Sequence, residues 1–411
     1  MLNTVSSLPP AAGASNAPGT SLNQFGIIYF GNDWSGENRT SSHHIAERLA
    51  QRTRVLYIDT PGLRAPKASG RDLRKLFWKV LAAVRKPRAI GAQMWHISTP
   101  QIPFRRLPLV RQLNFAVGRF LVRRALRTLR FEKTISWFAV PHPGILAGRF
   151  DETLIVYYCI DDYAALPDVD AARVARMDDN LTRSADQVFV ASARLIASKR
   201  TLSPSAVHAP HGVDLALFQR ASDPSCPVAD GARNLKHPVI GFYGLIEAWI
   251  DLDLIAFLAE QKPEWTFLLI GRLAVDPGRL PTLPNVQFAG PQPYTSLPNW
   301  AKAFDVAIIP YRPTRQVMNS NPLKLREYLA TGKPVVAVSA PEIDQFADYV
   351  HIARSPEEFL GCIEDALAND SAADRARRIE AVAGMSWEVR MQKVVEIVES
   401  KIRQKESSLP K

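Results

Sequence analysis

The sequence predicts an α/β fold with two doubly wound parallel-sheet domains, and three observations support this prediction. The chain has 411 residues, more than one ordinary domain needs and suited to two of about 150–200 residues each. Short apolar, β-branched runs alternate with helical patterns, as expected of parallel sheets covered by helices on both faces. A stretch at 219–238, rich in Pro, Asp, Ser and Gly, interrupts this alternation and is typical of a linker.

The first domain is predicted to span 25–222, after a tail at 1–24. The tail has neither the basic segment nor the apolar core of a signal peptide, so we expect it to be disordered. Apolar runs predict strands at 25–31, 54–60, 94–100, 133–138, 154–162, 187–192 and 206–214. Helical spacing predicts helices at 41–52 and 170–184.

The second domain is predicted to span 235–385, where the alternation restarts. Its predicted strands cover 238–244, 265–271, 286–290, 305–311 and 335–339. Its predicted helices cover 251–261, 295–303 and 322–331, and an amphipathic helix follows at 386–405. Two domains of this type bind ligands in the cleft between them, at the carboxyl ends of their strands.

Composition and motifs exclude several classes of protein. No apolar run approaches the roughly 20 residues that cross a membrane. The sequence lacks GxGxxG and GxxxxGK[ST], which argues against a dinucleotide oxidoreductase and a P-loop enzyme. The DxD-like sequences at 168–170 and 251–253 lie in or beside predicted helices, so we expect no metal there. Spacing typical of a disulfide framework or a zinc site is missing among Cys159, Cys226 and Cys362.

The stretch NPLKLREYLATGKPVVAVS, which begins at Asn321, combines features of an anion site and a ribose site. Asn321 is a good N-cap and Pro322 a good first helical residue, and the free N–H groups of a first turn bind phosphate. Lys324 in that turn opposes the helix dipole unless an anion lies there. The carboxylate of Glu327 can accept hydrogen bonds from two ribose hydroxyls. The alternative is a well-capped surface helix with a Lys–Glu pair, ended by Gly332.

This stretch closely resembles the nucleotide-sugar helix of retaining GT-B glycosyltransferases, the glycosyl transferases group 1, where P-x-K-x-x-E-Y-x-A-x-G-K-P-V-V is common. Further similar segments are PHGVDLALF at 210–218, the regions 239–271 and 286–312, and SWEVRMQKVVEIV. The resemblance is strong over 205–400 and weaker over 25–200, and it is greatest to teichuronic-acid-type enzymes of bacterial envelope polysaccharide clusters. It implies the GT-B fold, in which two Rossmann-like domains face a central cleft and the helix at 386–405 crosses back to the first domain.

The resemblance also implies a donor site in the second domain. Glu327 would bind the ribose, Lys324 with the preceding backbone would bind the diphosphate, and the base would lie near Gly290. Asn319 stands where many relatives have an acid, and the cations that usually follow Gly244 are missing, so arginines elsewhere would supply the charge. The implied donor-binding residues are Gly244, Arg272, Gly290, Pro291, Arg312, Asn319, Ser320, Asn321, Pro322, Leu323, Lys324 and Glu327.

Candidate acceptor residues follow strands of the first domain. Asp161 and Asp162 end a buried strand and can orient an acceptor hydroxyl or act as a base, or else serve as caps and loop hydrogen-bonding groups. His142 follows another strand and can face the same cleft, or else belongs to a turn. A loop after the first strand is predicted to let an acceptor or phosphate approach closely, or to be merely flexible; its candidate residues are Gly31, Asn32 and Gly36.

Positive charge is concentrated in one part of the chain. The net charge is +11, whereas residues 63–133 contain 18 Lys and Arg and only 2 Asp and Glu. Within this region, 104–133 alternates Arg with apolar residues, a pattern that favours an anionic membrane surface. A solvated helix face packed on the sheet is the alternative. We expect no nucleic acid partner, because no nucleic-acid motif accompanies the charge.

Together these observations predict a metal-independent hexosyltransferase-type glycosyltransferase without a cofactor. It would move a sugar from a nucleoside-diphosphate donor, with a UDP-sugar favoured, to a lipid-linked or polysaccharide acceptor in envelope or exopolysaccharide biosynthesis. We expect it in the cytoplasm, peripheral to the inner face of the cytoplasmic membrane. A nucleotide-sugar 2-epimerase on the same fold and a non-catalytic sugar-nucleotide-binding scaffold remain as alternatives.

Overall fold

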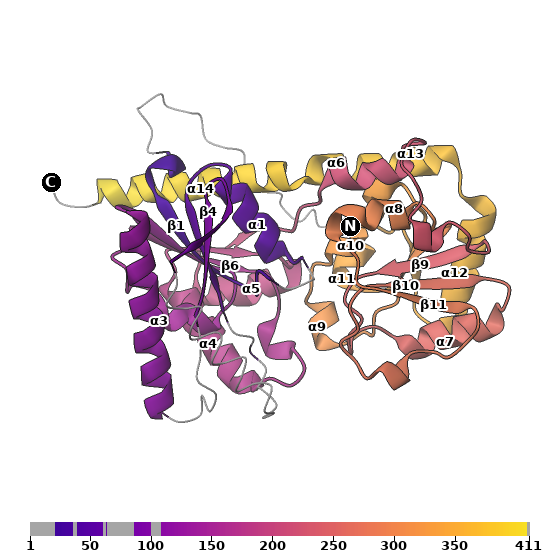
Figure 1. Cartoon of the computed structure of the whole chain (residues 1–411), viewed down its shortest axis with the longest axis horizontal. Coiled ribbons are helices and arrows are strands. Elements are labelled where there is room, and N and C mark those ends of the chain that lie inside the picture. The colour runs from indigo at the N-terminus through magenta and orange to yellow at the C-terminus, as the bar shows by residue number, and fades with distance from the viewer. Residues whose placement is uncertain (1–20, 36–38, 61–62, 64–85, 100–107, 409–411) are drawn as a thin grey trace. The chain divides into compact units, whose positions relative to one another are not determined.

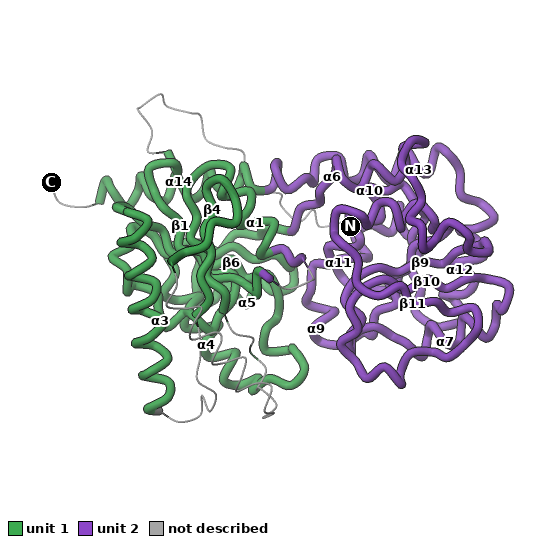
Figure 2. Tube along the Cα trace, in the orientation of Figure 1, with its two compact units in different colours: residues 1–34, 42–210, 391–411 green, residues 35–41, 211–390 purple. Residues whose placement is uncertain are grey.

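The chain forms two compact units, which are shown in Figure 2. Unit 1 contains the described residues up to 34, those at 42–210 and those from 391 onward. Unit 2 contains the described residues of 35–41 and 211–390. The computed structural model (Figure 1) describes residues 21–35, 39–60, 63, 86–99 and 108–408.

Unit 1 is built on a sheet of eight strands within the described residues, in the order β3-β4-β2-β1-β5-β6-β7-β8. All neighbours pair in parallel except β3 and β4, which are antiparallel. The sequence did not predict β3, because it is a short exposed edge strand without an apolar run. The strands are β1 Gly26–Gly31, β2 Val55–Asp59, β3 Arg88–Gly91, β4 Met94–Ser98, β5 Thr134–Phe138, β6 Leu154–Cys159, β7 Gln187–Val190 and β8 Val207–His208.

Unit 2 contains a second sheet, in the order β11-β10-β9-β12-β13-β14, with every pair parallel. Its short last strand, β14, was not predicted. The strands are β9 Val239–Tyr243, β10 Thr266–Ile270, β11 Val286–Gly290, β12 Val306–Ile309, β13 Val335–Val338 and β14 His351–Ala353. The predicted α/β class with two parallel-sheet domains is therefore confirmed.

Helices connect these strands, as parallel pairing requires. Those whose residues lie mainly in unit 1 are α1 Ser41–Ala50, α3 Pro108–Leu129, α4 Ala171–Ser184 and α5 Ala193–Leu202. Those of unit 2 are α6 Leu215–Phe218, α7 Leu252–Gln261, α8 Leu297–Ala301, α9 Arg315–Met318, α10 Leu323–Thr331, α11 Pro341–Asp344, α12 Pro356–Asn369 and α13 Ala372–Ala381. The last helix, α14 Trp387–Ser407, contributes its first residues to unit 2 and the rest to unit 1.

Each sheet has its own apolar core. In unit 1 the central strand β1 is buried along its whole length, and Phe30 stacks on Phe138 with ring centroids 4.6 Å apart. In unit 2 the ring of Phe304 occupies the space that a side chain at Gly241 would need. Burial on both faces explains why these strands are continuous apolar runs in the sequence.

The stretch at 219–238, predicted as a linker, lies within unit 2, and the chain passes from unit 1 to unit 2 between Pro210 and His211. It forms two short 3₁₀ turns and buries Cys226 and Ala232. Its composition is that of turns, and turns packed on a domain have the same composition as an exposed linker.

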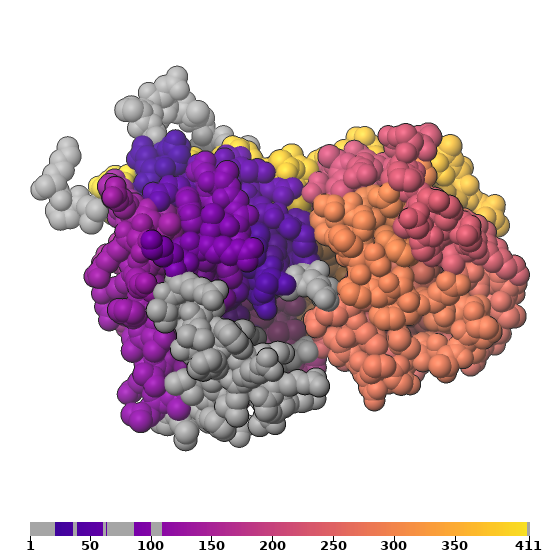
Figure 3. All heavy atoms as spheres, in the orientation of Figure 1, coloured from indigo at the N-terminus to yellow at the C-terminus, as the bar shows by residue number. Residues whose placement is uncertain are grey.

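The helix α3 lies at the surface of unit 1 (Figure 3). Its inner face buries Val122 and Leu126, whereas Leu109, Leu113 and Phe120 are 78%, 50% and 65% exposed. Part of the basic region, at 64–85 and 100–107, lies outside the described residues. Among the described helices, none combines the length and apolar character that a membrane span requires.

The start of α14 packs tightly inside unit 2. A methyl group at Gly212 would lie 2.7 Å from the backbone N and Cα atoms of Trp387. We expect Gly212→Ala to lower the free energy of unfolding by about 1–3 kcal/mol, because the clash involves rigid backbone. The control is Gly361→Ala, at an exposed helical position with open space around it, which should raise stability by up to about 1 kcal/mol. Urea unfolding followed by circular dichroism compares them, and equal effects would contradict this packing.

Candidate donor site and neighbouring polar clusters

Three neighbouring strands of unit 2 end in glycines at one edge of the sheet. Gly244, Gly271 and Gly290 follow or end β9, β10 and β11, with φ of 142°, 138° and 69°. A side chain at Gly271 would overlap the carbonyl of Gly244, whereas the space beside Gly290 is open. Only glycine adopts these conformations easily, so the backbone itself is presented at this edge.

The helix α10 follows β12 and begins without a side-chain cap. Asn321 was predicted as the N-cap, but this prediction is wrong: the cap position is Pro322, and the helix starts at Leu323. Asn321 instead accepts hydrogen bonds from Arg326 (2.9 Å) and from the His211 backbone (3.3 Å), and donates to Glu342 (2.5 Å). Its side chain is therefore used for tertiary contacts, and the first-turn N–H groups have no side-chain acceptor of their own.

Asn321 lies in a buried polar network. Asn321, Arg326, Glu342 and His211 are each at most 4% exposed. Burial lowers the pKa of His211 to about 3, so the imidazole is neutral, and its Nδ1–H donates to the carbonyl of Asn321 (2.8 Å). Burial also lowers the pKa of Arg326 to about 10, which leaves it charged at neutral pH. The network ties His211, at the point where the chain passes from unit 1 to unit 2, to the start of α10.

The carboxyl group of Glu327 lies one turn into α10 and is 6% exposed. The Tyr294 hydroxyl donates to its Oε1 at 3.3 Å. Burial raises the pKa of Glu327 to about 7, despite the opposing effect of nearby Lys324. A buried acceptor of this kind gains from hydroxyl donors more than an exposed one does.

The side chain of Lys324 folds back over the end of β9. A side chain at Gly244 would overlap it, and its Nζ lies 5.8 Å from the ring centroid of Phe242. One edge of unit 2 therefore brings together the Lys324 ammonium group, the first turn of α10 and Gly244. This combination of a cation, free N–H groups and bare backbone suits a phosphate group.

The arginines expected near this edge differ in their surroundings. Arg312 bonds Asp251 (3.2 Å) and Asp253 (2.5 Å), and Asp251 also caps α7. The DxD-like sequence at 251–253 thus forms a helix start and an ion pair. Arg272 is exposed, and its carbonyl accepts from the backbone of Ile246. The guanidinium group of Arg312 is therefore already paired with two carboxylates.

The residues just before α10 form the end of α9. Asn319 is the residue after its last turn, and the Ser320 hydroxyl donates to the carbonyl of Val317 (2.9 Å). Pro291 follows Gly290 and is exposed. Pro291 thus borders the glycine edge in sequence, whereas Asn319 and Ser320 border the start of α10.

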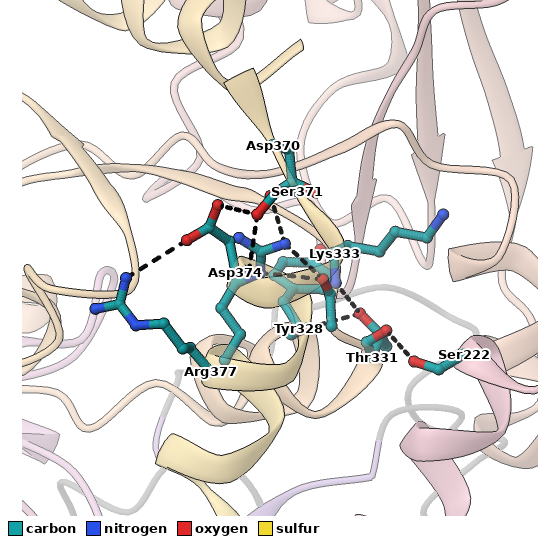
Figure 4. A network of polar contacts seen from close by, with 10 residues as sticks. Ser222, Tyr328, Thr331, Lys333, Asp370, Ser371, Asp374 and Arg377 are labelled. Atoms are coloured by element: carbon teal, nitrogen blue, oxygen red, sulfur yellow. Dashed lines mark hydrogen bonds and ion pairs between the residues drawn. The ribbon is translucent and has the colours of Figure 1, made fainter. Parts of the chain in front are cut away.

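The far end of α10 is fixed by a second network, drawn in Figure 4. Gly332 takes the predicted left-handed conformation, with φ 72°. Its carbonyl accepts two hydrogen bonds from Arg378 (3.0 and 2.8 Å), which also pairs with Asp370 (2.6 Å). The hydroxyl of Ser222 donates to the carbonyl of Thr331 at 2.7 Å. A cavity of about 280 Å³ beside Arg378 is lined by residues of 347–378, and neither Glu327 nor Lys324 borders it.

The predicted acceptor residues lie in unit 1. Asp161 and Asp162 follow β6, and His142 follows the neighbouring strand β5, so the sheet brings all three to one edge. Asp161 accepts from the backbone N–H of Asp162 at 2.8 Å. The space beside Gly31 is filled by Tyr57 and Ser42.

The loop after β1 is held by the neighbouring elements. The carbonyl of Asn32 accepts from the Tyr57 hydroxyl at 2.7 Å, and its N–H donates to Ser42 at 3.4 Å. Gly36 lies outside the described residues.

Sequence reasoning missed a polar cluster in unit 1. Asp59, the last residue of β2, accepts from the backbone N–H of Trp34 (2.7 Å) and the hydroxyl of Ser98 (3.0 Å). The Nε2 atom of His96 lies 2.7 Å from its Oδ2 atom. The sequence shows only that an acid ends the buried run RVLYID, because the partners of this acid lie in other segments of the chain.

Comparisons by sequence found two kinds of similarity to known proteins. Residues 234–369 match the family model described as glycosyl transferases group 1. Over 337 residues the chain is 26% identical to TuaH of Bacillus subtilis, and this match covers 74% of this chain and 83% of TuaH. The name of TuaH gives that protein a glycosyltransferase role in teichuronic acid biosynthesis.

Solved structures share the fold. Sucrose-phosphate synthase of Thermosynechococcus elongatus has a TM-score of 0.67 at 15% identity, covering 92% of this chain and all of that one. HepE of Anabaena, solved with UDP and glucose, has a TM-score of 0.62 at 16% identity, with the same coverage.

The buried carboxyl group predicts a pH-dependent affinity for UDP. The ionised form of Glu327 accepts hydroxyl donors, so binding should be full above its pKa and lost as the pH falls through about 7. We expect the association constant to rise roughly tenfold between about pH 6 and about pH 8, measured by isothermal titration calorimetry. The side chain in Glu327→Gln cannot ionise, so this variant shows only the pH dependence that comes from UDP itself. The same change of association constant with pH in both proteins would contradict this assignment.

Proposed function

We propose that this chain, a group 1 glycosyltransferase of the GT-B fold, transfers a sugar from a UDP-sugar to a saccharide acceptor in envelope polysaccharide biosynthesis. The observation that carries the proposal is the buried Glu327 carboxyl group on a helix whose first turn has no side-chain cap. The name of TuaH supports the polysaccharide assignment, and the UDP and glucose bound to HepE support the donor class.

The donor would be bound by unit 2 in three parts. Glu327 accepts the ribose hydroxyls, and the first turn of α10 with Lys324 binds the diphosphate. The base lies beside the open backbone at Gly290. Because the helix end and the ammonium group are already in place, they stabilise the charge that develops on the departing diphosphate without reorganising.

The acceptor would be handled by residues of unit 1. Asp161, Asp162 and His142 follow adjacent strands and can orient a hydroxyl group for attack. We assign these residues to acceptor binding because the donor features described above all lie in unit 2.

We place the enzyme at the cytoplasmic face of a membrane, where lipid-linked acceptors are presented. The outer face of α3 supports this placement. Leu109, Leu113 and Phe120 recur at helical spacing and are exposed, and Arg124 and Arg127 are exposed one and two turns further on. An apolar stripe next to exposed arginines fits the boundary between acyl chains and anionic headgroups.

The donor assignment is tested by titrating UDP, GDP, ADP and CMP into the protein. We expect one nucleotide to bind, and Glu327→Ala to weaken it by about 1.5–3 kcal/mol, roughly 10- to 100-fold, because charged hydrogen bonds are lost. The control is Glu260→Ala, an exposed acid of unit 2, which should bind like wild type. If no nucleotide binds, or if both variants behave alike, α10 is only a structural helix and a scaffold role replaces catalysis.

The membrane placement is tested by cosedimentation with phosphatidylcholine vesicles with and without phosphatidylglycerol. Wild type should bind only the anionic vesicles, and less at higher salt. Phe120→Ser should weaken binding roughly tenfold, since one buried aromatic side chain contributes about 1.5–3 kcal/mol. Phe288→Ser, at an exposed phenylalanine of unit 2, is the matched control. Equal binding to both kinds of vesicle would contradict the placement.

A further inference from the structure

A compact polar and aromatic cluster at the carboxyl edge of the unit 1 sheet is not used by the roles assigned above. It joins the loop after β1 to the ends of β2 and β4, which neighbour each other in the order β4-β2-β1. Its members are Trp34, Asp59, His96 and Ser98. Three residues from two other segments, Trp34 from the loop after β1 and His96 and Ser98 from β4, converge on the carboxylate of Asp59.

The carboxylate of Asp59 has unused hydrogen-bonding capacity. Its Oδ1 accepts from Trp34, and its Oδ2 accepts from Ser98 and faces His96. An ionised carboxylate offers about four lone-pair sites, so these three partners leave room for one more donor. The side chains of Asp59 and His96 are 14% and 16% exposed, and the Nε2 atom of His96 is buried against Asp59, so a solute can meet the carboxylate and the outer part of the imidazole.

The indole of Trp34 packs against neighbouring aromatic side chains. Its ring centroid lies 5.3 Å from that of His43 and 5.0 Å from that of Tyr57, the latter in an edge-on arrangement. The backbone bond to Asp59 fixes the same residue from the other side. Trp34 remains partly exposed, so part of its surface is accessible to a ligand.

This arrangement combines an apolar surface with hydrogen-bonding groups next to it. A pyranose ring has matching parts, since its axial C–H groups form an apolar face and its equatorial hydroxyls donate and accept hydrogen bonds at the rim. Binding sites that recognise small polar molecules pair an aromatic wall with a few placed polar groups.

We propose that Trp34, Asp59 and His96 form a subsite for a pyranose unit of the acceptor saccharide. The proposal rests on the proposed function for the class of ligand. Trp34 packs on the apolar face of the sugar, Asp59 accepts a hydrogen bond from one hydroxyl, and His96 contacts a second. The strand order β4-β2-β1-β5-β6 places the subsite on the same sheet edge as His142, which follows β5, and Asp161, which follows β6.

The test is saturation-transfer NMR on the full chain with methyl β-glucopyranoside, methyl β-galactopyranoside and methyl N-acetyl-β-glucosaminide. At least one probe should receive saturation from wild type. Trp34→Ala and His96→Gln should each weaken its binding about tenfold or more, because each removes one of the two kinds of contact. Trp34→Phe, which keeps an aromatic surface, should retain most of the binding.

Controls separate this proposal from folding and from the proposed function. Phe288→Ala removes an exposed aromatic residue of unit 2 and should bind the probe like wild type. UDP binding by calorimetry should be the same in all variants of unit 1, because the donor residues lie in unit 2. Failure of the wild-type protein to bind UDP would overturn the proposed function. A sugar signal from the same protein would still support the subsite. Failure of wild type to bind any of the three glycosides, or equal binding by Trp34→Ala, would overturn the subsite.

Discussion

The candidate donor site depends on the side chain of one buried residue, Asn321. Its carboxamide accepts from Arg326 and from the backbone of His211, and donates to Glu342, so it satisfies partners from three segments at once. Few side chains of this size offer an acceptor and a donor together. Removing one member of a buried charged network of this kind costs about 3–5 kcal/mol, because the others are left unpaired.

The use of Asn321 in this network has a consequence for α10. The side chain that local rules would place as a cap is used for these tertiary contacts, and the cap position falls to Pro322, which has no side-chain acceptor. The first-turn N–H groups are then available to an anion, and Lys324 supplies a positive charge beside them. At the other end, Arg378 holds the carbonyl of Gly332. A helix fixed at both ends can keep Glu327 in place while a ligand binds.

Burial determines the protonation of two groups in unit 2. It raises the pKa of Glu327 to about 7 and lowers that of His211 to about 3, so one group titrates near neutral pH and the other stays neutral. In unit 1, the parallel sheet collects polar residues from successive strand ends along a single edge. The order β4-β2-β1-β5-β6 places the cluster around Asp59 and the residues after β6 on the same sheet edge.

Local sequence determined the α/β class, the positions of most strands, the glycine that ends α10, and the position of Glu327 one turn into that helix. These features depend on periodicity and on residues a few positions apart, which a sequence displays directly. Tertiary structure alone decided the role of Asn321, the pairing of Arg312 with acids of α7, the meeting of Asp59 with His96, and the pKa of Glu327. The partners of Asn321 are as far as 110 residues away in the chain. Such contacts depend on which strands become neighbours and on how deeply a group is buried, and neither is encoded in any short stretch of sequence.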